Sequence, residues 1–161
     1  MPLNAAGVAS SINSAYQDVI STNDVNTSLN LMKSAWQNAY HGDASASVNP
    51  IATGAGSAGV IGAAYAGLTG SVTNNVDVLA QMFADYWATS HLAPVPPCVS
   101  ILGNDAATKV GAYKAAIMGV ITTSESTPYF EALFVAVESV TKTIIWSGVT
   151  NLGAPLTGSV S

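Results

Sequence analysis

Apolar residues separated by three or four positions recur in five segments of the chain, and this spacing limits its fold more than any other feature. It places the apolar side chains on one face of an α-helix, and that face must be buried against another element. The five expected helices cover approximately residues 8–19, 25–40, 75–91, 105–122 and 128–145. The sequence therefore predicts a mainly α-helical fold, a single-domain bundle of about five amphipathic helices.

Residues that favour helix ends support several of these predicted helix boundaries. Asn23 or Asp24 would cap the start of the second helix, because their side chains can accept hydrogen bonds from free backbone N–H groups. Gly42 is expected to end this helix. Three prolines between residues 94 and 97 prevent the third helix from continuing, because proline lacks the backbone donor and its ring clashes with the preceding turn.

The fifth helix is expected to begin at Thr127 and Pro128, a capping residue followed by the residue type favoured at the first helical position. Its apolar pattern continues to Ile145. Glu138 and Lys142 are spaced to form an ion pair on its outer side. Aromatic residues on the apolar faces are expected in the core: Trp36, Phe83, Trp87, Phe130, Phe134 and Trp146.

Between the second and third helices lies a glycine- and alanine-rich connection, residues 54–70, in which small residues recur at every fourth position. It is either a short sixth helix whose small residues let another backbone approach closely, or a loop. Residues 99–102 and 120–123 are short strand candidates. Residues 147–161 show no period and are expected to form an extended C-terminal arm, which leaves residues 1–146 as the helical domain.

Charge is scarce in this chain. Of its 161 residues only 8% are charged, against about 25% in typical globular domains. Its four basic residues are all lysines, and the formal net charge is −5. Nucleic acid and anionic membrane surfaces both require clustered basic side chains, so the sequence predicts neither as a partner. A surface with so little charge suits contact with other protein subunits, since the cores of interfaces are depleted in charge.

The N-terminal residues 1–4 lack the basic and apolar regions of a signal peptide, and no run of 18 apolar residues suggests a membrane-spanning helix. Cys98 is the single cysteine, so the chain cannot form an internal disulfide. A reactive thiol needs a nearby cation or helix N-terminus, and no basic residue lies within ten positions. Cys98 is therefore expected to be a small buried apolar residue.

Residues 54–59, Gly-Ala-Gly-Ser-Ala-Gly, fit the G-x-G-x-x-G pattern of dinucleotide-binding loops. The pattern indicates dinucleotide binding only when it follows a buried strand within a βαβ unit. Here Pro50 lies where that central strand would run, and proline is not expected in a central strand. Ser57 also lies in a sequence close to a nucleophile elbow, for which His91 with Asp77 or Asp85 would have to supply the partners. A loop or close-packed helix of small residues explains the segment equally well.

His41 and Asp43 are two possible metal ligands, but a zinc or iron site needs three or four. At a helix C-terminus His41 would instead be favoured by the helix dipole, and the same applies to His91. Glu125, Glu131 and Glu138 follow the outer face of the fifth helix and are expected to be solvated. We therefore assign no catalytic, cofactor-binding or metal-binding residues and expect no cofactor.

In composition, size and its glycine-, threonine- and serine-rich end, the chain resembles small structural virion proteins of tailed bacteriophages. This resemblance involves no diagnostic motif, so it assigns no residue roles. It implies a non-enzymatic structural subunit of the head, neck or tail, located in the virion. Its partners would be other copies of itself and neighbouring structural proteins, in a homo-oligomeric assembly.

Two alternatives remain open at this stage. The chain could be a small enzyme or nucleotide-binding protein that uses residues 54–59. It could also be a membrane-active protein in which residues 55–70 insert into a bilayer, although helices with a single apolar face favour a soluble bundle.

Overall fold

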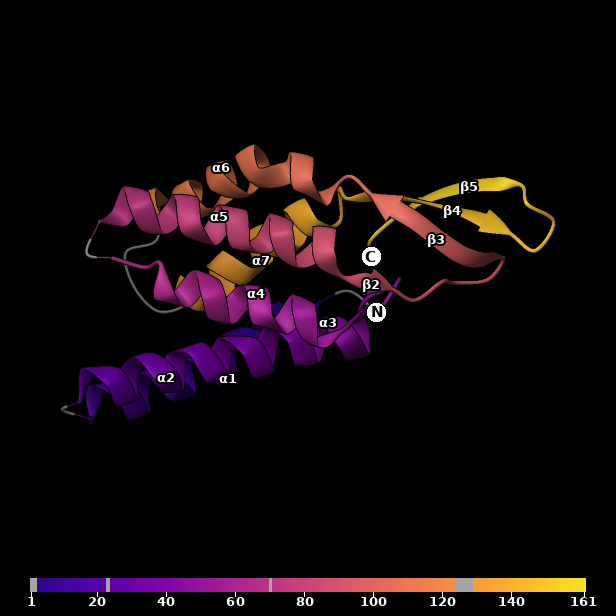
Figure 1. The fold of residues 1–161 in the computed structure, drawn as a ribbon. Helices are drawn as coiled ribbons and strands as arrows, with labels where there is room; N and C mark the ends of the chain where they lie inside the picture. Colours follow the sequence, from indigo (N-terminus) through magenta and orange to yellow (C-terminus); the bar gives the residue numbers. More distant parts are fainter. Residues whose placement is uncertain (1–2, 23, 70, 124–128) are drawn as a thin grey trace.

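A computed structural model of the chain describes residues 3–22, 24–69, 71–123 and 129–161. It confirms a mainly α-helical protein, to which a small antiparallel sheet is added (Figure 1). The helices are α1 (Ala5–Ile20), α2 (Val25–Trp36), the π-helical turn η1 (Gln37–His41), α3 (Gly42–Ser47), α4 (Ala55–Ala66), α5 (Val72–Thr89), the 3-10 turn η2 (Ala106–Lys109), α6 (Val110–Thr123) and α7 (Tyr129–Thr141). The strands are β1 (Ala52–Thr53), β2 (His91–Leu92), β3 (Cys98–Asn104), β4 (Ile145–Thr150) and β5 (Pro155–Ser159).

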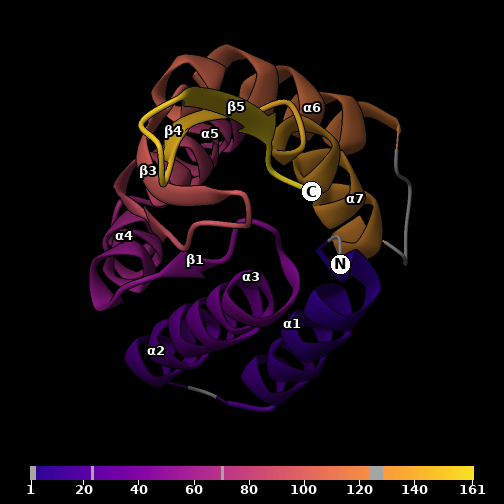
Figure 2. The same ribbon diagram turned by 90° about the vertical axis from the view of Figure 1, so that its right-hand side faces the viewer.

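Six of the helices pack side by side in a closed ring. Going around the ring, α1 packs against α2, α2 against α4, α4 against α5, α5 against α6, α6 against α7, and α7 against α1. Figure 2 looks along this ring from the end that carries the sheet. Because each of the six helices contributes buried apolar residues to the centre, the ring encloses one continuous core.

Aromatic side chains fill the centre of the ring. Its largest members are Trp36, Tyr40, Phe83, Tyr86, Trp87, Tyr113 and Phe134. Most of the polar atoms in this group are hydrogen-bonded: the indole Nε1 of Trp87 donates to the hydroxyl of Tyr40 at 3.0 Å. The hydroxyls of Tyr113 and Thr141 are 2.8 Å apart. Of the aromatic residues expected in the core, Trp36, Phe83, Trp87 and Phe134 are buried, whereas Phe130 and Trp146 are only partly buried.

The second predicted helix begins where expected, at the start of α2, but the helical run continues past its predicted end through η1 and α3. Asp24 caps it by accepting hydrogen bonds from the N–H groups of Asn26 and Thr27. Gly42 does not end it, because its backbone is right-handed helical (φ −60°, ψ −44°) and the chain passes through η1 into α3. His41 therefore lies inside a helical run rather than at its C-terminus. Its ring is held by Tyr86, whose hydroxyl is 2.8 Å from Nδ1 of His41.

The glycine- and alanine-rich segment forms a helix, α4, and not a loop. One of its small residues permits a close contact with α2: a Cβ at Gly62 would lie 2.7 Å from Cε of Lys33. Just beyond α2, the side chain of Gln37 in η1 donates a hydrogen bond to the carbonyl of Ala58 in α4, at 2.7 Å. Packing against α2 thus compensates for the low helix propensity of the glycines.

Two expectations for the end of the chain are wrong. The fifth helix stops at Thr141, and Ile144 and Ile145 follow a turn, so that Ile145 begins strand β4. Residues 147–161 are not an extended arm, because β4 and β5 form a hairpin that pairs with β3. Strand β4 therefore spans the expected domain boundary between residues 146 and 147. The residues expected to start the fifth helix, Thr127 and Pro128, lie outside the described residues.

The two strand candidates have different outcomes. Residues 99–102 lie within β3, as predicted, whereas residues 120–123 belong to helix α6. In α6 the side chains of Tyr113, Ile117 and Val120 are buried in the ring core. Their spacing by three and four outweighs the β-branched residues at the end of the segment.

Candidate interaction surface

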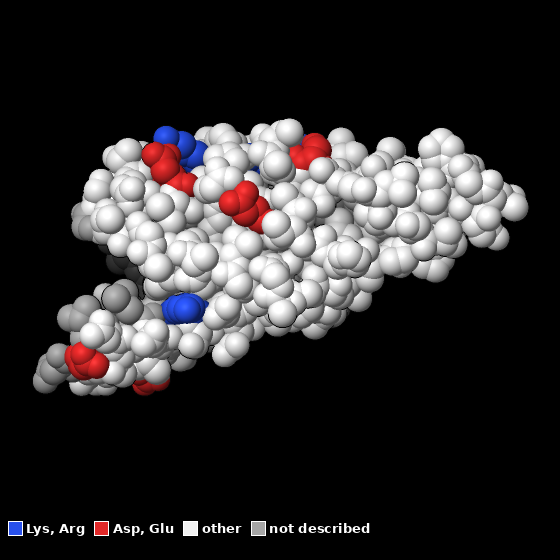
Figure 3. Space-filling view, viewed as in Figure 1, with Lys and Arg blue, Asp and Glu red and all other residues white. Residues whose placement is uncertain are grey.

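Strands β3, β4 and β5 form an antiparallel sheet in that order, and it extends beyond the end of the helical ring (Figure 1). We call residues 98–104 and 145–159 the projecting sheet. None of these residues is an aspartate, glutamate, lysine or arginine. On the face shown in Figure 3 the charged side chains lie over the helices, and the sheet is free of them. The few charged residues of the chain are therefore unevenly distributed, and the projecting sheet has none.

Large apolar side chains are exposed on the projecting sheet. Val99 is 53% exposed, Leu102 69% and Ile145 52%, and Leu152 in the turn between β4 and β5 is 90% exposed. Exposed apolar groups on a surface region without charge are typical of protein contact surfaces. The projecting sheet is the best candidate for such a surface in the described part of the chain.

Two glycines allow Trp146 to lie across one face of the sheet. A Cβ at Gly158 would lie 2.5 Å from the indole ring of Trp146. A Cβ at Gly148 would lie 2.5 Å from Sγ of Cys98 and 2.6 Å from the carbonyl oxygen of Ser100. Cys98 is buried in this layer, as predicted, and its Sγ donates to the Ser100 carbonyl at 3.2 Å. The sheet therefore depends on glycine at two positions where sequence patterns suggest a loop.

Asp105 joins the projecting sheet to the helical ring. Its carboxylate accepts a hydrogen bond from the N–H of Ile145 at 2.7 Å and lies 3.0 Å from the ammonium group of Lys109. Partial burial acts to raise the pKa of Asp105, but the bond from Ile145 and the ion pair with Lys109 outweigh it and lower the pKa. Asn104 adds a second link, because its side-chain amide donates to the Trp87 carbonyl on α5 at 3.0 Å.

The two outer strands of the sheet differ in regularity. The register between β4 and β5 is uninterrupted over five residue pairs. The register between β3 and β4 shifts twice, between Cys98 and Ser100 and between Ile101 and Gly103. Each shift leaves an extra residue in β3, and these residues are the exposed Val99 and Leu102. Bulges of this kind disturb the spacing of hydrogen-bonding groups along an edge and protect it from pairing with another strand.

The structure does not place the glycine-rich motif in a dinucleotide-binding unit. Gly54, with φ +111°, follows the two-residue strand β1 and precedes α4. However, β1 pairs antiparallel with β2, whereas a dinucleotide loop lies in a parallel βαβ unit. Ser57 is buried and its hydroxyl accepts a hydrogen bond from the hydroxyl of Ser90 at 3.1 Å, so among the described residues it is bonded to a serine and not to a histidine.

The other residues singled out in the sequence are dispersed. His91 is exposed on β2 and not at a helix end. The carboxylate of Asp43 accepts the N–H of Asn4 at 2.7 Å. Asp77 pairs with Lys114, and Asp85 accepts a hydrogen bond from Gln81. Among the described residues no three potential metal ligands come together.

The glutamates on the last helix have separate environments. Glu131 is exposed on α7, as expected. Glu138 forms the predicted ion pair with Lys142 at 2.6 Å, but its side chain is only 15% exposed and is not solvated as expected. Glu125 lies outside the described residues. None of the helices in the described part of the chain combines the length and apolarity needed to cross a bilayer.

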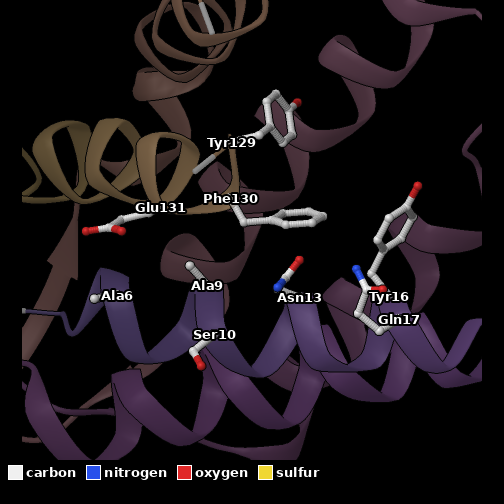
Figure 4. A pocket seen from close by; sticks show the side chains of 9 residues that line it. All are labelled: Ala6, Ala9, Ser10, Asn13, Tyr16, Gln17, Tyr129, Phe130 and Glu131. Atoms are coloured by element: carbon white, nitrogen blue, oxygen red, sulfur yellow. The ribbon is translucent and has the colours of Figure 1, made fainter. Parts of the chain in front are cut away.

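The described residues of the helical ring line a groove and a second hollow. The larger, of about 610 Å³, is a groove between α1 and α7, where the rings of Tyr16 and Phe130 meet edge to face at 6.2 Å (Figure 4). Glu131 is the one acidic group among the described residues that line it, so it holds no acid–base pair. The second, of about 340 Å³, is lined mainly by apolar residues, including Trp36. The Nε1 atom of Trp36 is buried and makes no hydrogen bond to the described residues.

Sequence reasoning did not indicate where an exposed part of the surface without charge would lie. The signal that it missed is the pair of apolar and glycine-containing segments, residues 145–150 and 155–159, separated by a turn that contains Gly153 in a left-handed conformation (φ +77°). Comparisons of this chain with known protein families, with curated proteins and with solved structures find no match.

Proposed function

We propose that this chain is a structural subunit of a homo-oligomeric assembly, and that copies of it meet through the projecting sheet. The observation that carries the proposal is a sheet without charge that exposes Val99, Leu102, Ile145 and Leu152 to solvent. Such a surface gains free energy when its apolar area is removed from water, and no charged group has to be desolvated.

The distribution of charge favours another copy as the partner. All nine acids and four lysines lie outside the projecting sheet, and the formal net charge of the chain is −5. Two copies that meet through their sheets keep their negatively charged helical rings apart. Copies that meet through the rings would bring like charges together, which opposes association.

We further propose that the assembly is part of a tailed-bacteriophage virion, in its head, neck or tail. The support is the resemblance in composition and size to small structural proteins of such particles, together with a surface suited to neutral contacts between subunits. Mass spectrometry of purified phage particles tests this placement. The chain should be found in many copies per particle, and its absence from purified particles would contradict a role in the virion.

Self-assembly is tested by sedimentation velocity over a wide range of concentrations. The wild-type chain should increase in mass with concentration, and a double variant with one lysine on each outer strand of the sheet, Leu102→Lys with Thr157→Lys, should remain monomeric. Like charges brought together across an interface cost several kcal/mol, and each ~1.4 kcal/mol raises the dissociation constant tenfold.

A matched double variant controls for the change in net charge. Leu31→Lys with Val135→Lys adds the same two charges to α2 and α7, where these residues are 40% and 52% exposed. It should associate at least as well as the wild type, because the net charge of each copy becomes less negative. A wild-type chain that stays monomeric at every concentration, or equal effects of the two double variants, would contradict assembly through the sheet.

A further inference from the structure

The outer edge of β5 is a regular row of backbone groups. The N–H of Thr150 bonds to the carbonyl of Ala154 at 2.9 Å, and the N–H of Val160 bonds to the carbonyl of Ile144 at 3.1 Å. Hydrogen-bonded residues alternate along an antiparallel pair, so every second residue from 154 to 160 faces β4. The residues between them, Pro155, Thr157 and Ser159, direct their backbone groups to the outer edge.

Not all of these outward groups are free to bond. Pro155 has a carbonyl but no N–H. The carbonyl of Ser159 accepts a hydrogen bond from the indole Nε1 of Trp146 at 3.3 Å. At the next outward position, Ser161 exchanges two backbone hydrogen bonds with Asn49, of 2.9 and 3.0 Å, which closes the edge there. The open edge therefore consists of the carbonyl of Pro155, both backbone groups of Thr157 and the N–H of Ser159.

We propose that two copies of the chain pair antiparallel through this edge, with Thr157 of one copy opposite Thr157 of the other. The proposal rests on the proposed function, since it specifies how copies meet. In this register the two Thr157 residues exchange two hydrogen bonds, and each Ser159 N–H donates to the Pro155 carbonyl of the other copy. The missing N–H of Pro155 lies opposite the Ser159 carbonyl that Trp146 already occupies, so the two gaps in the edge coincide.

This self-complementarity is the reason to name a second copy as the occupant. A strand of another protein would meet an edge with one missing donor and one occupied acceptor, whereas a second β5 carries the same gaps at the matching places. The open edge also has the same length as the β5 strand of the second copy that would pair with it. Strand β3 is a poorer partner because its two bulges break the regular spacing. Two-fold pairing through β5 produces one continuous sheet in the order β3-β4-β5-β5-β4-β3.

A proline on the open edge tests the contact. Thr157→Pro removes the central outward N–H but no bond to β4, so the hairpin of each copy should stay intact. We expect this variant to be monomeric at concentrations at which the wild type is dimeric, with an increase of the dissociation constant of at least about tenfold. Thr157→Val keeps the backbone N–H and the side-chain shape and should dimerise like the wild type.

Hydrogen exchange shows whether the variant has kept its hairpin. The amides of Leu156 and Gly158 bond to β4 and should stay protected in Thr157→Pro. In the wild type the amides of Thr157 and Ser159 should become protected on association. If these two amides exchange freely in an associated wild-type chain, the edge of β5 is not the contact.

Cysteine cross-linking tests the register. Directly opposite residues of a hydrogen-bonded antiparallel pair have Cα atoms about 5.5 Å apart, a distance that a disulfide spans. Thr157→Cys should therefore form a covalent dimer under mild oxidation. Ser159→Cys should not, because the two Ser159 residues would be about 14 Å apart along the paired strands. The native Cys98 is buried and is common to both variants.

The outcomes separate this inference from the proposed function. A wild-type chain that never associates contradicts both. A wild-type chain that associates while Thr157→Pro associates equally well contradicts the β5 contact alone, and assembly through another part of the sheet still stands. Cross-linking at Ser159 without cross-linking at Thr157 contradicts the register.

Discussion

Raising the pH above 10 is expected to unfold this protein cooperatively. Three tyrosines at the centre of the helical ring, Tyr40, Tyr86 and Tyr113, are almost completely removed from solvent. Burial, which opposes the charged form, is the largest cause that raises the pKa of each well above its usual value. The neighbouring Tyr40 adds to the effect on Tyr86 and Tyr113. Burial also raises the pKa of Tyr65, at the edge of the ring, to about 12.

The sign of the effect follows from proton release. In the unfolded chain tyrosine ionises near pH 10, whereas the buried hydroxyls keep their protons to higher pH. Above pH 10 the unfolded state therefore binds fewer protons than the folded state, and the free energy of unfolding falls as the pH rises. Each fully buried tyrosine contributes about 1.4 kcal/mol per pH unit, so the three together contribute about 4 kcal/mol per unit. Below pH 10 their contribution to stability is fully present.

Urea unfolding at a series of pH values measures this slope. The free energy of unfolding should decrease steeply from about pH 10 upward, and tyrosinate absorbance should increase in the same transition. Tyr113→Phe is the matched control. It removes one of the three buried hydroxyls, and the slope should fall by about a third. A free energy of unfolding that stays constant to about pH 11, or a slope unchanged in the variant, would contradict the proposed role of these tyrosines.

The helices could be predicted from the sequence where their apolar residues fall on a single face. Helices α1, α2 and α5 show this pattern, and α5 stops before the prolines that follow Leu92. The pattern failed at Gly42, because glycine favours a helix end only where the backbone becomes left-handed, and here it stays right-handed. Whether α4 is a helix was left open by its sequence, because its stability comes from packing on α2 and not from its glycines.

Within the projecting sheet, β3 was partly predicted, but β4 and β5 could not be, because they do not show the usual alternation of apolar and polar residues. The face of β4 and β5 that carries Trp146 requires glycine at positions 148 and 158, and the resulting segments look like loops. Ile144 and Ile145 continue the apolar spacing of α7 only by coincidence. Ile144 is buried after the turn that ends α7, whereas Ile145 is exposed on the sheet. The low charge of the chain predicted a contact surface, but charge counts alone do not locate it.

The largest effect on assembly is expected from a single methyl group at Gly148. In Gly148→Ala the new Cβ would lie 2.6 Å from the backbone carbonyl of Ser100 and 2.5 Å from the buried Sγ of Cys98. Neither neighbour is a flexible chain end, so β3 must move away from β4. Forcing an extra carbon into such a contact costs about 1–3 kcal/mol. The matched control is Gly103→Ala on β3, where a Cβ meets no atom within 4 Å and stability should change by less than about 0.5 kcal/mol.

The consequence for assembly follows from the size of the sheet. Once β3 is displaced, β4 and β5 remain as a two-stranded hairpin, which is at best marginally stable in water without further packing. The edge of β5 is then no longer held in register, although the helical ring keeps its own aromatic core. Gly148→Ala should therefore retain the helical circular dichroism of the wild type while it loses amide protection at Leu156 and Gly158 and sediments as a monomer. If it associates as strongly as Gly103→Ala, the sheet does not hold the copies together.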